Sequence, residues 1–312
     1  MAVAVNAQRP LKLMRTGRDV RSLEPPTLGR VQPVCSFVNA EVARLRNMSI
    51  AIGAACAIGA ILFPLLTRIG DVRIPLVLAG GIFAVWFVRA RRELVSHCTN
   101  LAAKRFVAAM NRGLSYKAGS SLTQQQFQAS DLFRESVHRW SSHDEIAGRA
   151  DGVRFTLHRV RATAKARGEM VFDGVVIKID FASGFPGHTV VVPDGDAGPI
   201  GNRVKKDLVM LKHPTFEKHF SVFASDYYEA RRLVSPHLME VVLAAAPSFP
   251  DGIRMAFVAR SLFVAVRTEG LRVDAPLFGA PLTPETAVGP LMRMVTFAEA
   301  LAASLDVVGV HA

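Results

Sequence analysis

Two apolar segments near the N-terminus constrain this chain more than any other feature of its sequence. Ser49 to Thr67 carries no charged residue, and Ile74 to Val88 follows after the short link Arg68 to Arg73. Roughly 19 helical residues reach about 28 Å, which is close to the roughly 30 Å hydrocarbon core of a bilayer. A buried helical hairpin in a soluble core is the alternative, but the first segment has no polar stripe. The pair predicts a two-span transmembrane hairpin over residues 48–89.

Basic residues flank this hairpin more densely than they occupy its link. The chain has 38 Lys and Arg against 26 Asp and Glu, and its formal net charge is +12. Arginines precede the first segment and follow the second, whereas the link holds only Arg68 and Arg73 as basic residues. By the positive-inside rule, this distribution predicts a multi-pass protein of a bacterial cytoplasmic (inner) membrane with both termini in the cytosol.

The flanking arginines account for much of the positive charge, so nucleic acid is not an expected partner. Residues 1–47 are rich in arginine and proline and lack a clear period, which predicts a largely disordered basic arm. The lysines further along the chain are not interleaved with aromatic residues, as a nucleic-acid surface would require. Basic residues near the expected membrane are candidate contacts for anionic lipid. These candidates are Arg89, Arg91, Arg92, Lys205 and Lys206.

The chain changes its periodicity twice beyond the hairpin. Apolar residues recur every three or four positions from Arg89 to Asn111, and again from Thr123 to Trp140, so we expect a helical stalk over residues 90–142. Residues 143–312 then alternate with a period of two and are broken by turn residues, which is typical of strands. Predicted strands cover 153–160, 171–181, 189–192, 208–211, 219–224, 253–258 and 262–267; predicted helices cover 227–234, 236–246 and a last segment that begins at Pro284.

Strands and helices do not alternate regularly in this region, which excludes a doubly wound fold. The predicted fold class is therefore α+β. It comprises an N-terminal transmembrane helical hairpin and stalk, then a cytosolic domain with a mainly antiparallel sheet, an inserted helical segment and a closing C-terminal helix.

No recognised catalytic, cofactor or metal motif occurs in the chain, and we predict no catalytic residue, cofactor or metal site. His143, Asp144 and Glu145 are ligand types, but neighbours in an extended segment point to different sides. The alternative is a membrane-bound enzyme without a recognisable motif. Its acid–base groups would be Asp226 with Tyr227 and Tyr228, or Asp144 with Glu145.

A series of short motifs is similar to an uncharacterised bacterial membrane-protein family, numbered 3137 among the domains of unknown function. The likeness covers roughly residues 40–308. It implies a hydrophobic pair before a cytosolic domain, and it implies no reaction, cofactor or catalytic residue. The motifs are Leu114-Ser115-Tyr116, Ser130-Asp131-Leu132-Phe133, Asp144-Glu145-Ile146-Ala147-Gly148, Val171-Phe172-Asp173-Gly174, Gly187-His188-Thr189-Val190-Val191, the run from Phe216 to Asp226, and the run from Glu229 to Pro236.

These observations predict a membrane-anchored cytosolic interaction module that binds a protein partner or anionic lipid. An accessory subunit of a transport complex is a further alternative. Glu229 and Arg232 lie three positions apart on a predicted helix, and a simple ion pair between them is the alternative to a binding role. The candidate interaction surface consists of Phe216, Phe220, Asp226, Glu229, Arg231 and Arg232.

Overall fold

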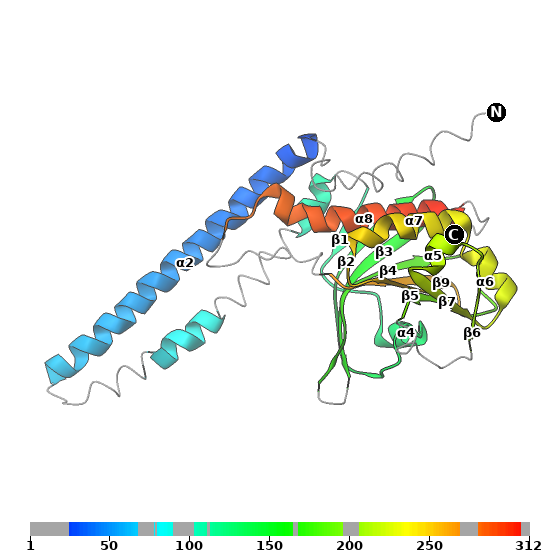
Figure 1. Ribbon diagram of the computed structural model, residues 1–312. Coiled ribbons are helices and arrows are strands. Elements are labelled where there is room, and N and C mark those ends of the chain that lie inside the picture. The colour runs from blue at the N-terminus through cyan, green and yellow to red at the C-terminus, as the bar shows by residue number, and fades with distance from the viewer. Residues whose placement is uncertain are drawn as a thin grey trace. The chain divides into compact units, whose positions relative to one another are not determined.

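The computed structural model describes residues 25–67, 78, 80–89, 103–110, 113–164, 168–195, 206–268 and 280–306 (Figure 1). These residues fall into two compact units. The first contains the described residues of Met110–Leu271 and Gly289–Ala312, and the second contains those of Glu24–Ala109 and Arg272–Val288.

A nine-stranded antiparallel sheet forms the centre of the first unit, with the strand order β1-β2-β3-β4-β9-β8-β5-β7-β6. Strands β1 to β4 pair in sequence order, whereas β4 pairs with the much later β9. The strands are β1 Ser115–Lys117, β2 Val137–Ala150, β3 Val153–Ala164, β4 Met170–Asp180, β5 Thr189–Pro193, β6 Asp207–Leu208, β7 Phe220–Ala224, β8 Ile253–Val258 and β9 Ser261–Val266.

Helices cover both faces of this sheet (Figure 1). On one face α4 packs with Phe127 against Phe172 and other buried strand residues. On the other face lie α7 and the part of α8 that follows Gly289, and Phe297 of α8 contacts Phe249. The helices of this unit are α4 Gln124–Ala129, α5 Pro214–Glu217, α6 Tyr227–Leu233, α7 Pro236–Ala245, the short 3₁₀ helix η1 Ala246–Ser248 and α8 Pro284–Asp306, which begins in the second unit.

Local sequence signals explain where several of these elements begin. The Asp226 carboxylate accepts a hydrogen bond from Glu229 N–H at the start of α6, and Ser235 Oγ accepts one from Leu238 N–H at the start of α7. Such caps satisfy amide groups that have no partner within the helix. The mixed α+β character and the large antiparallel sheet agree with the fold class that the sequence predicts.

The predicted transmembrane hairpin is wrong. Among the residues that the structure describes, no helix combines the length and the apolar character needed to cross a bilayer. Residues 49–67 are instead the C-terminal part of one long helix, α2 (Pro25–Thr67), which continues without a break from a part that contains Arg44 and Arg46.

The multi-pass inner-membrane localisation and the cytosolic placement of both termini rested on this hairpin and are not supported. Residues 80–89 are helical, but the expected link at 68–73 lies outside the described residues, as do Arg91, Arg92 and residues 1–24. Residues 25–47, which we expected to be disordered, belong to α2.

The predicted helical stalk is also wrong in its second half. The helix expected over residues 123–140 ends at Ala129, and strand β2 begins at Val137. Asp131 adopts a left-handed backbone conformation with φ 58°, which a continuing helix cannot contain. Residues 103–109 are helical, whereas residues 90–102 lie outside the described part of the chain.

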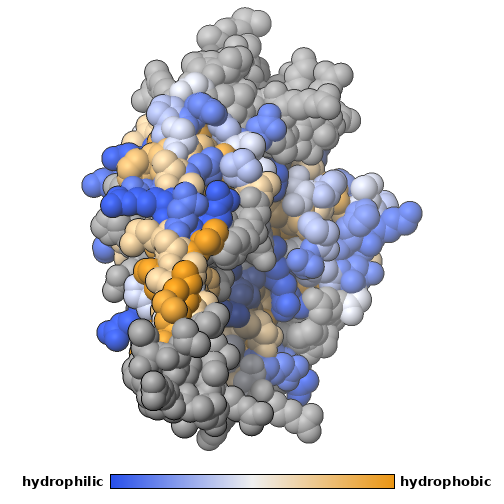
Figure 2. Space-filling model, turned by 90° about the vertical axis from the view of Figure 1, so that its left-hand side faces the viewer, coloured by the Kyte–Doolittle hydropathy of each residue, from blue (hydrophilic) through white to orange (hydrophobic). Residues whose placement is uncertain are grey.

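The second unit is organised around α2. The Asn39 side-chain amide donates to the Leu282 carbonyl oxygen and accepts from Leu282 N–H, each at 2.9 Å. Arg105 stacks on the Phe37 ring at 5.1 Å. Large hydrophobic side chains are exposed on α2 and on the helical segment 80–89, including Ile58 (57%) and Ile82 (68%). Figure 2 shows a group of hydrophobic residues on the surface of the molecule.

Candidate functional site

Hydrogen bonds join three segments of the first unit that lie far apart in the sequence but all belong to the motifs noted above. His188 N–H donates to Ser225 Oγ at 2.8 Å, and Ser225 N–H donates to the His188 carbonyl oxygen at 3.0 Å. The His188 ring nitrogen Nε2 lies 3.0 Å from the Ser130 carbonyl oxygen, so this nitrogen carries the proton. Burial lowers the pKa of His188. A neutral imidazole therefore fixes the relative positions of these segments.

Glu229 belongs to the same network and is 6% exposed. Its Oε2 accepts a hydrogen bond from Gly187 N–H at 2.6 Å, which ties α6 to the segment before β5. A Cβ atom at position 187 would overlap this oxygen, so the close approach depends on glycine. The Glu229 carboxylate thus makes an internal hydrogen bond that stabilises the fold, and it is not accessible to a partner protein.

Two further residues of the predicted interaction surface lie in the interior. Phe216 and Phe220 are 1% and 4% exposed, and their rings stack with centroids 5.0 Å apart. Their side chains are therefore not available to a partner. Asp226, Arg231 and Arg232 are exposed, as a binding role requires.

The exposed face of α6 carries two tyrosines that the predicted surface did not include. Tyr228 is 83% exposed and Tyr227 is 42% exposed. Arg231 donates to the Tyr227 hydroxyl at 3.3 Å, and its guanidinium lies 5.7 Å from the centre of the Tyr227 ring. Sequence reasoning considered these tyrosines only as possible acid–base groups. The run Tyr227-Tyr228 at a helix start, followed by two arginines, was the signal for an interface.

Strand β6 lies beside this face and forms one edge of the sheet. Asp207 pairs with Ala224, the last residue of β7, and α6 begins at Tyr227 directly after it (Figure 1). Side chains alternate along the edge, because Val209 is buried whereas Leu208 and Met210 are 58% and 56% exposed.

The edge leaves backbone groups available as well. Val209 N–H donates to the Val222 carbonyl oxygen, and Leu208 stands opposite Phe223. In an antiparallel pair the residues on either side of such a bonded position turn their N–H and C=O groups away from the partner strand. Leu208 and Met210 therefore present backbone groups and apolar side chains together. The docking surface, as we define it, consists of Leu208, Met210, Tyr227, Tyr228, Arg231 and Arg232.

The carboxylates Asp144 and Glu145 occupy a β-bulge in β2, where the register shifts between His143 and Glu145. Tyr116 donates to Asp144 Oδ1 at 2.6 Å, and Ser121 N–H donates to Glu145 Oε2 at 2.7 Å. Burial and this hydrogen bond raise the pKa of Tyr116. These contacts hold the segment from β1 to α4 on the sheet.

His158 lies at the centre of this polar region and is fully buried. Its Nδ1 is 2.8 Å from Ser120 Oγ, and its Nε2 is 2.9 Å from Thr156 Oγ1. Glu145 Oε2 lies 3.9 Å from Nδ1, on the same side of the ring as Ser120. A nucleophile and an acid that share one ring nitrogen do not make a catalytic triad, in which they occupy opposite nitrogens. Among the described residues, no group of three or more His, Cys, Asp or Glu side chains is arranged to hold a metal ion.

His158 should make the stability of the protein depend on pH. Burial lowers its pKa to about 4, whereas an unfolded chain binds the proton near pH 6.5. The unfolded chain therefore takes up the proton first, and the folded protein should lose roughly 3 kcal/mol of stability between pH 6.5 and pH 4. Urea unfolding at several pH values measures the loss. His158→Gln should flatten the dependence of stability on pH, whereas the control His143→Gln, at an exposed histidine, should leave it unchanged. Parallel curves of stability against pH for the wild type and both variants would refute the role of His158.

The candidate lipid contacts have different surroundings. Arg89 is exposed. Lys206 forms an ion pair with Asp131, and the two side chains are 4% and 1% exposed, so its ammonium group is engaged inside the fold. Lys205, Arg91 and Arg92 lie outside the described residues.

Together, fold and site define an α+β protein that presents an open sheet edge beside an aromatic, basic helix face. Residues 170–308 match the model of the family described as "Protein of unknown function (DUF3137)". This match confirms the predicted resemblance for this part of the chain, which contains the whole docking surface.

The other comparisons are weaker. No curated protein matches the chain. A crystal structure of the mycobacterial trehalose monomycolate transport factor A, TtfA, aligns with 13% sequence identity and a TM-score of 0.34, covering 65% of this chain and 96% of that chain. At this TM-score the likeness carries no argument about this chain.

Proposed function

We propose that this protein is a non-enzymatic interaction module that binds an extended, acidic segment of a partner protein at its docking surface. The observation that carries the proposal is the exposed apolar edge at β6. Natural proteins protect the edges of their sheets with charge, proline or covering elements, because an open edge pairs with other chains. Leu208 and Met210 instead expose more than half of their side chains at this edge.

An extended segment suits this edge because it can add a strand to the sheet. Its backbone would bond to the outward N–H and C=O groups of Leu208 and Met210, and its alternate side chains would contact their apolar surface. Binding of this kind needs no rearrangement of β7, which already pairs with the other side of β6.

The neighbouring helix face supports an acidic partner. Tyrosine and arginine are enriched among residues that dominate binding energy at protein interfaces. Guanidinium groups form charge-assisted hydrogen bonds with carboxylates, so the exposed Arg231 and Arg232 suit an acidic partner. The chain as a whole has a net charge of +12, which favours encounter with acidic segments.

The enzyme alternative has less support from the same residues. Asp226 is committed to capping α6, and Asp144 accepts a hydrogen bond from Tyr116. Neither pair of predicted acid–base groups lines the hollow that residues of β2, β3 and β4 form in the first unit.

A fluorescent peptide of alternating valine and glutamate tests the proposal by fluorescence anisotropy with the full-length protein. Leu208→Lys/Met210→Lys should weaken binding at least tenfold, because charged edge side chains oppose strand addition. Arg231→Gln/Arg232→Gln should weaken it by a similar factor through the lost charge pairs. The matched control is Arg149→Gln/Arg154→Gln, which removes two exposed charges at the far end of the β2–β3 hairpin.

Equal weakening by the control pair would mean that only net charge matters, and the docking surface would be refuted. Binding to anionic vesicles, with no binding of the peptide, would assign the surface to lipid instead. A photo-crosslinking amino acid at Tyr228 then identifies the partner in cells.

A further inference from the structure

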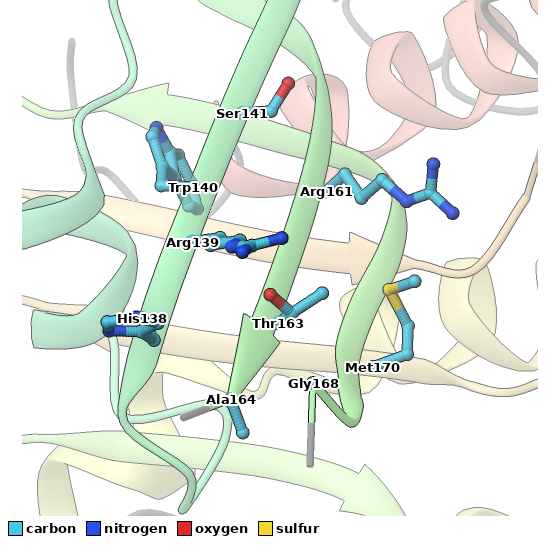
Figure 3. A pocket seen from close by; sticks show the side chains of 9 residues that line it. All are labelled: His138, Arg139, Trp140, Ser141, Arg161, Thr163, Ala164, Gly168 and Met170. Carbon is cyan, nitrogen blue, oxygen red and sulfur yellow. The ribbon is translucent and has the colours of Figure 1, made fainter. Parts of the chain in front are cut away.

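A hollow of about 620 Å³ lies on the sheet where β2, β3 and β4 meet, on the opposite half of the sheet from β6 (Figure 3). It is bordered by two arginines, two hydroxyl groups, an indole and a thioether. These belong to Arg139, Arg161, Ser141, Thr163, Trp140 and Met170.

Irregular strand pairing shapes this hollow. The register between β2 and β3 shifts between Val137 and Arg139, and the register between β3 and β4 shifts between Ala162 and Thr163. Each shift inserts an extra residue into one strand, which bends the strand and increases its twist. Two bends at the same end of three adjacent strands make a concave surface there.

Strand register brings the polar groups together. Arg139 stands opposite Thr163, and Ser141 stands opposite Arg161. Opposite residues, and residues two apart on one strand, project from the same face of a sheet. Two guanidinium groups and two hydroxyl groups therefore share one face. Trp140 lies between Arg139 and Ser141, and its ring packs against Phe127 at 5.1 Å.

The charge in this area is not balanced. Asp173 binds Arg159 Nη2 at 2.5 Å and lies 3.4 Å from Arg161 Nε. One carboxylate therefore faces two guanidinium groups, and Arg159 is the closer of the two. No carboxylate pairs with Arg139 among the described residues, and the Arg161 side chain is 62% exposed.

We propose that this hollow binds the phosphate group of a small organic phosphate. Arginine forms paired hydrogen bonds with phosphate oxygens, and hydroxyl groups donate to the oxygens that remain. A phosphate carries enough charge to engage both Arg139 and Arg161, and Met170, which stands opposite Thr163, provides apolar surface for the organic part. The site is independent of the docking surface, since it uses different strands and mostly residues before position 170.

Trp140 provides a nearby probe for this site, because it is the neighbour of both Arg139 and Ser141 in β2. The chain has two tryptophans, so Trp86→Phe leaves Trp140 as the sole indole of the full-length protein. Glycerol 3-phosphate and inorganic phosphate should change its emission in a saturable way. In that background, Arg139→Gln and Arg161→Gln should each weaken the response at least tenfold, and Arg139→Lys should restore part of it by keeping the charge.

Arg149→Gln is the matched control, because it removes one exposed charge from the other end of the same hairpin. It should leave the titration unchanged. Vesicles with and without phosphatidic acid form a second arm of the experiment, which distinguishes a lipid headgroup from a free phosphate as the source. A response to the soluble phosphates supports recognition of a free phosphate. A response to phosphatidic acid alone supports recognition of a lipid headgroup. No response to either, or equal weakening by Arg149→Gln, overturns the proposal.

Discussion

Replacing Lys206 with methionine should lower the free energy of unfolding by about 3–5 kcal/mol. Lys206 and Asp131 form an ion pair whose side chains are 4% and 1% exposed. Methionine keeps much of the apolar stem but leaves the carboxylate without this counter-charge, in a place where water does not solvate it. Equilibrium urea unfolding, followed by circular dichroism, measures the loss.

Two further variants isolate the ion pair. Lys218→Met makes the same chemical change at an exposed lysine and should alter stability by less than about 0.5 kcal/mol. Asp131→Asn/Lys206→Met should cost less than the sum of its single changes, because each single change already removes the ion pair. Asparagine tolerates the left-handed backbone of position 131, so the double variant adds no strain there. Equal midpoints for Lys206→Met and Lys218→Met would show that the pair contributes nothing.

Replacing Gly174 with alanine should cost about 3 kcal/mol or more, because the new methyl group has no room. A Cβ atom there would overlap the Val266 carbonyl oxygen and approach the Arg267 Cα to 2.9 Å. Both are backbone atoms, so β4 and β9 would have to move apart where their pairing begins at Val175. Thermal unfolding measures the effect. Gly119→Ala is the control, since its Cβ would meet no atom within 4 Å; similar melting temperatures for both variants would contradict this account.

Much of the sheet beyond residue 150 could be predicted from the sequence, because its strands alternate regularly and are bounded by turns. Strand β4 was expected at 171–181 and lies at Met170–Asp180. Hairpin β8–β9 and the capped helix α7 also agree with their expected positions within a residue or two.

Strand β2 could not be predicted, because its residues are mostly polar and its bulge at Asp144 shifts the side chains out of phase. The hairpin prediction failed for a different reason. Lack of charge alone does not show that segment 49–67 is a separate element, and the structure continues it in the N-terminal direction as part of α2.

The candidate site was only partly visible in the sequence. Aromatic residues occur both in cores and at interfaces, so Phe216 and Phe220 could not be distinguished from Tyr228 without knowing their burial. Glu229 suited an exposed ion pair by spacing, yet its true partner, Gly187, lies 42 residues away in the sequence. The hollow between β2, β3 and β4 depends on two register shifts, which no residue pattern in the sequence predicts.

The order of strands in the sheet has a consequence for how the chain emerges from the ribosome. Strands β1 to β4 pair with sequence neighbours, and they can form a meander as soon as they are synthesised. Strands β5 to β7 pair with one another, but they join the meander only through β8 and β9. Until those last strands leave the exit tunnel, two partial sheets each expose an unpaired central strand to other chains. Synthesis that stalls before residue 253 should therefore yield nascent chains that depend on chaperones.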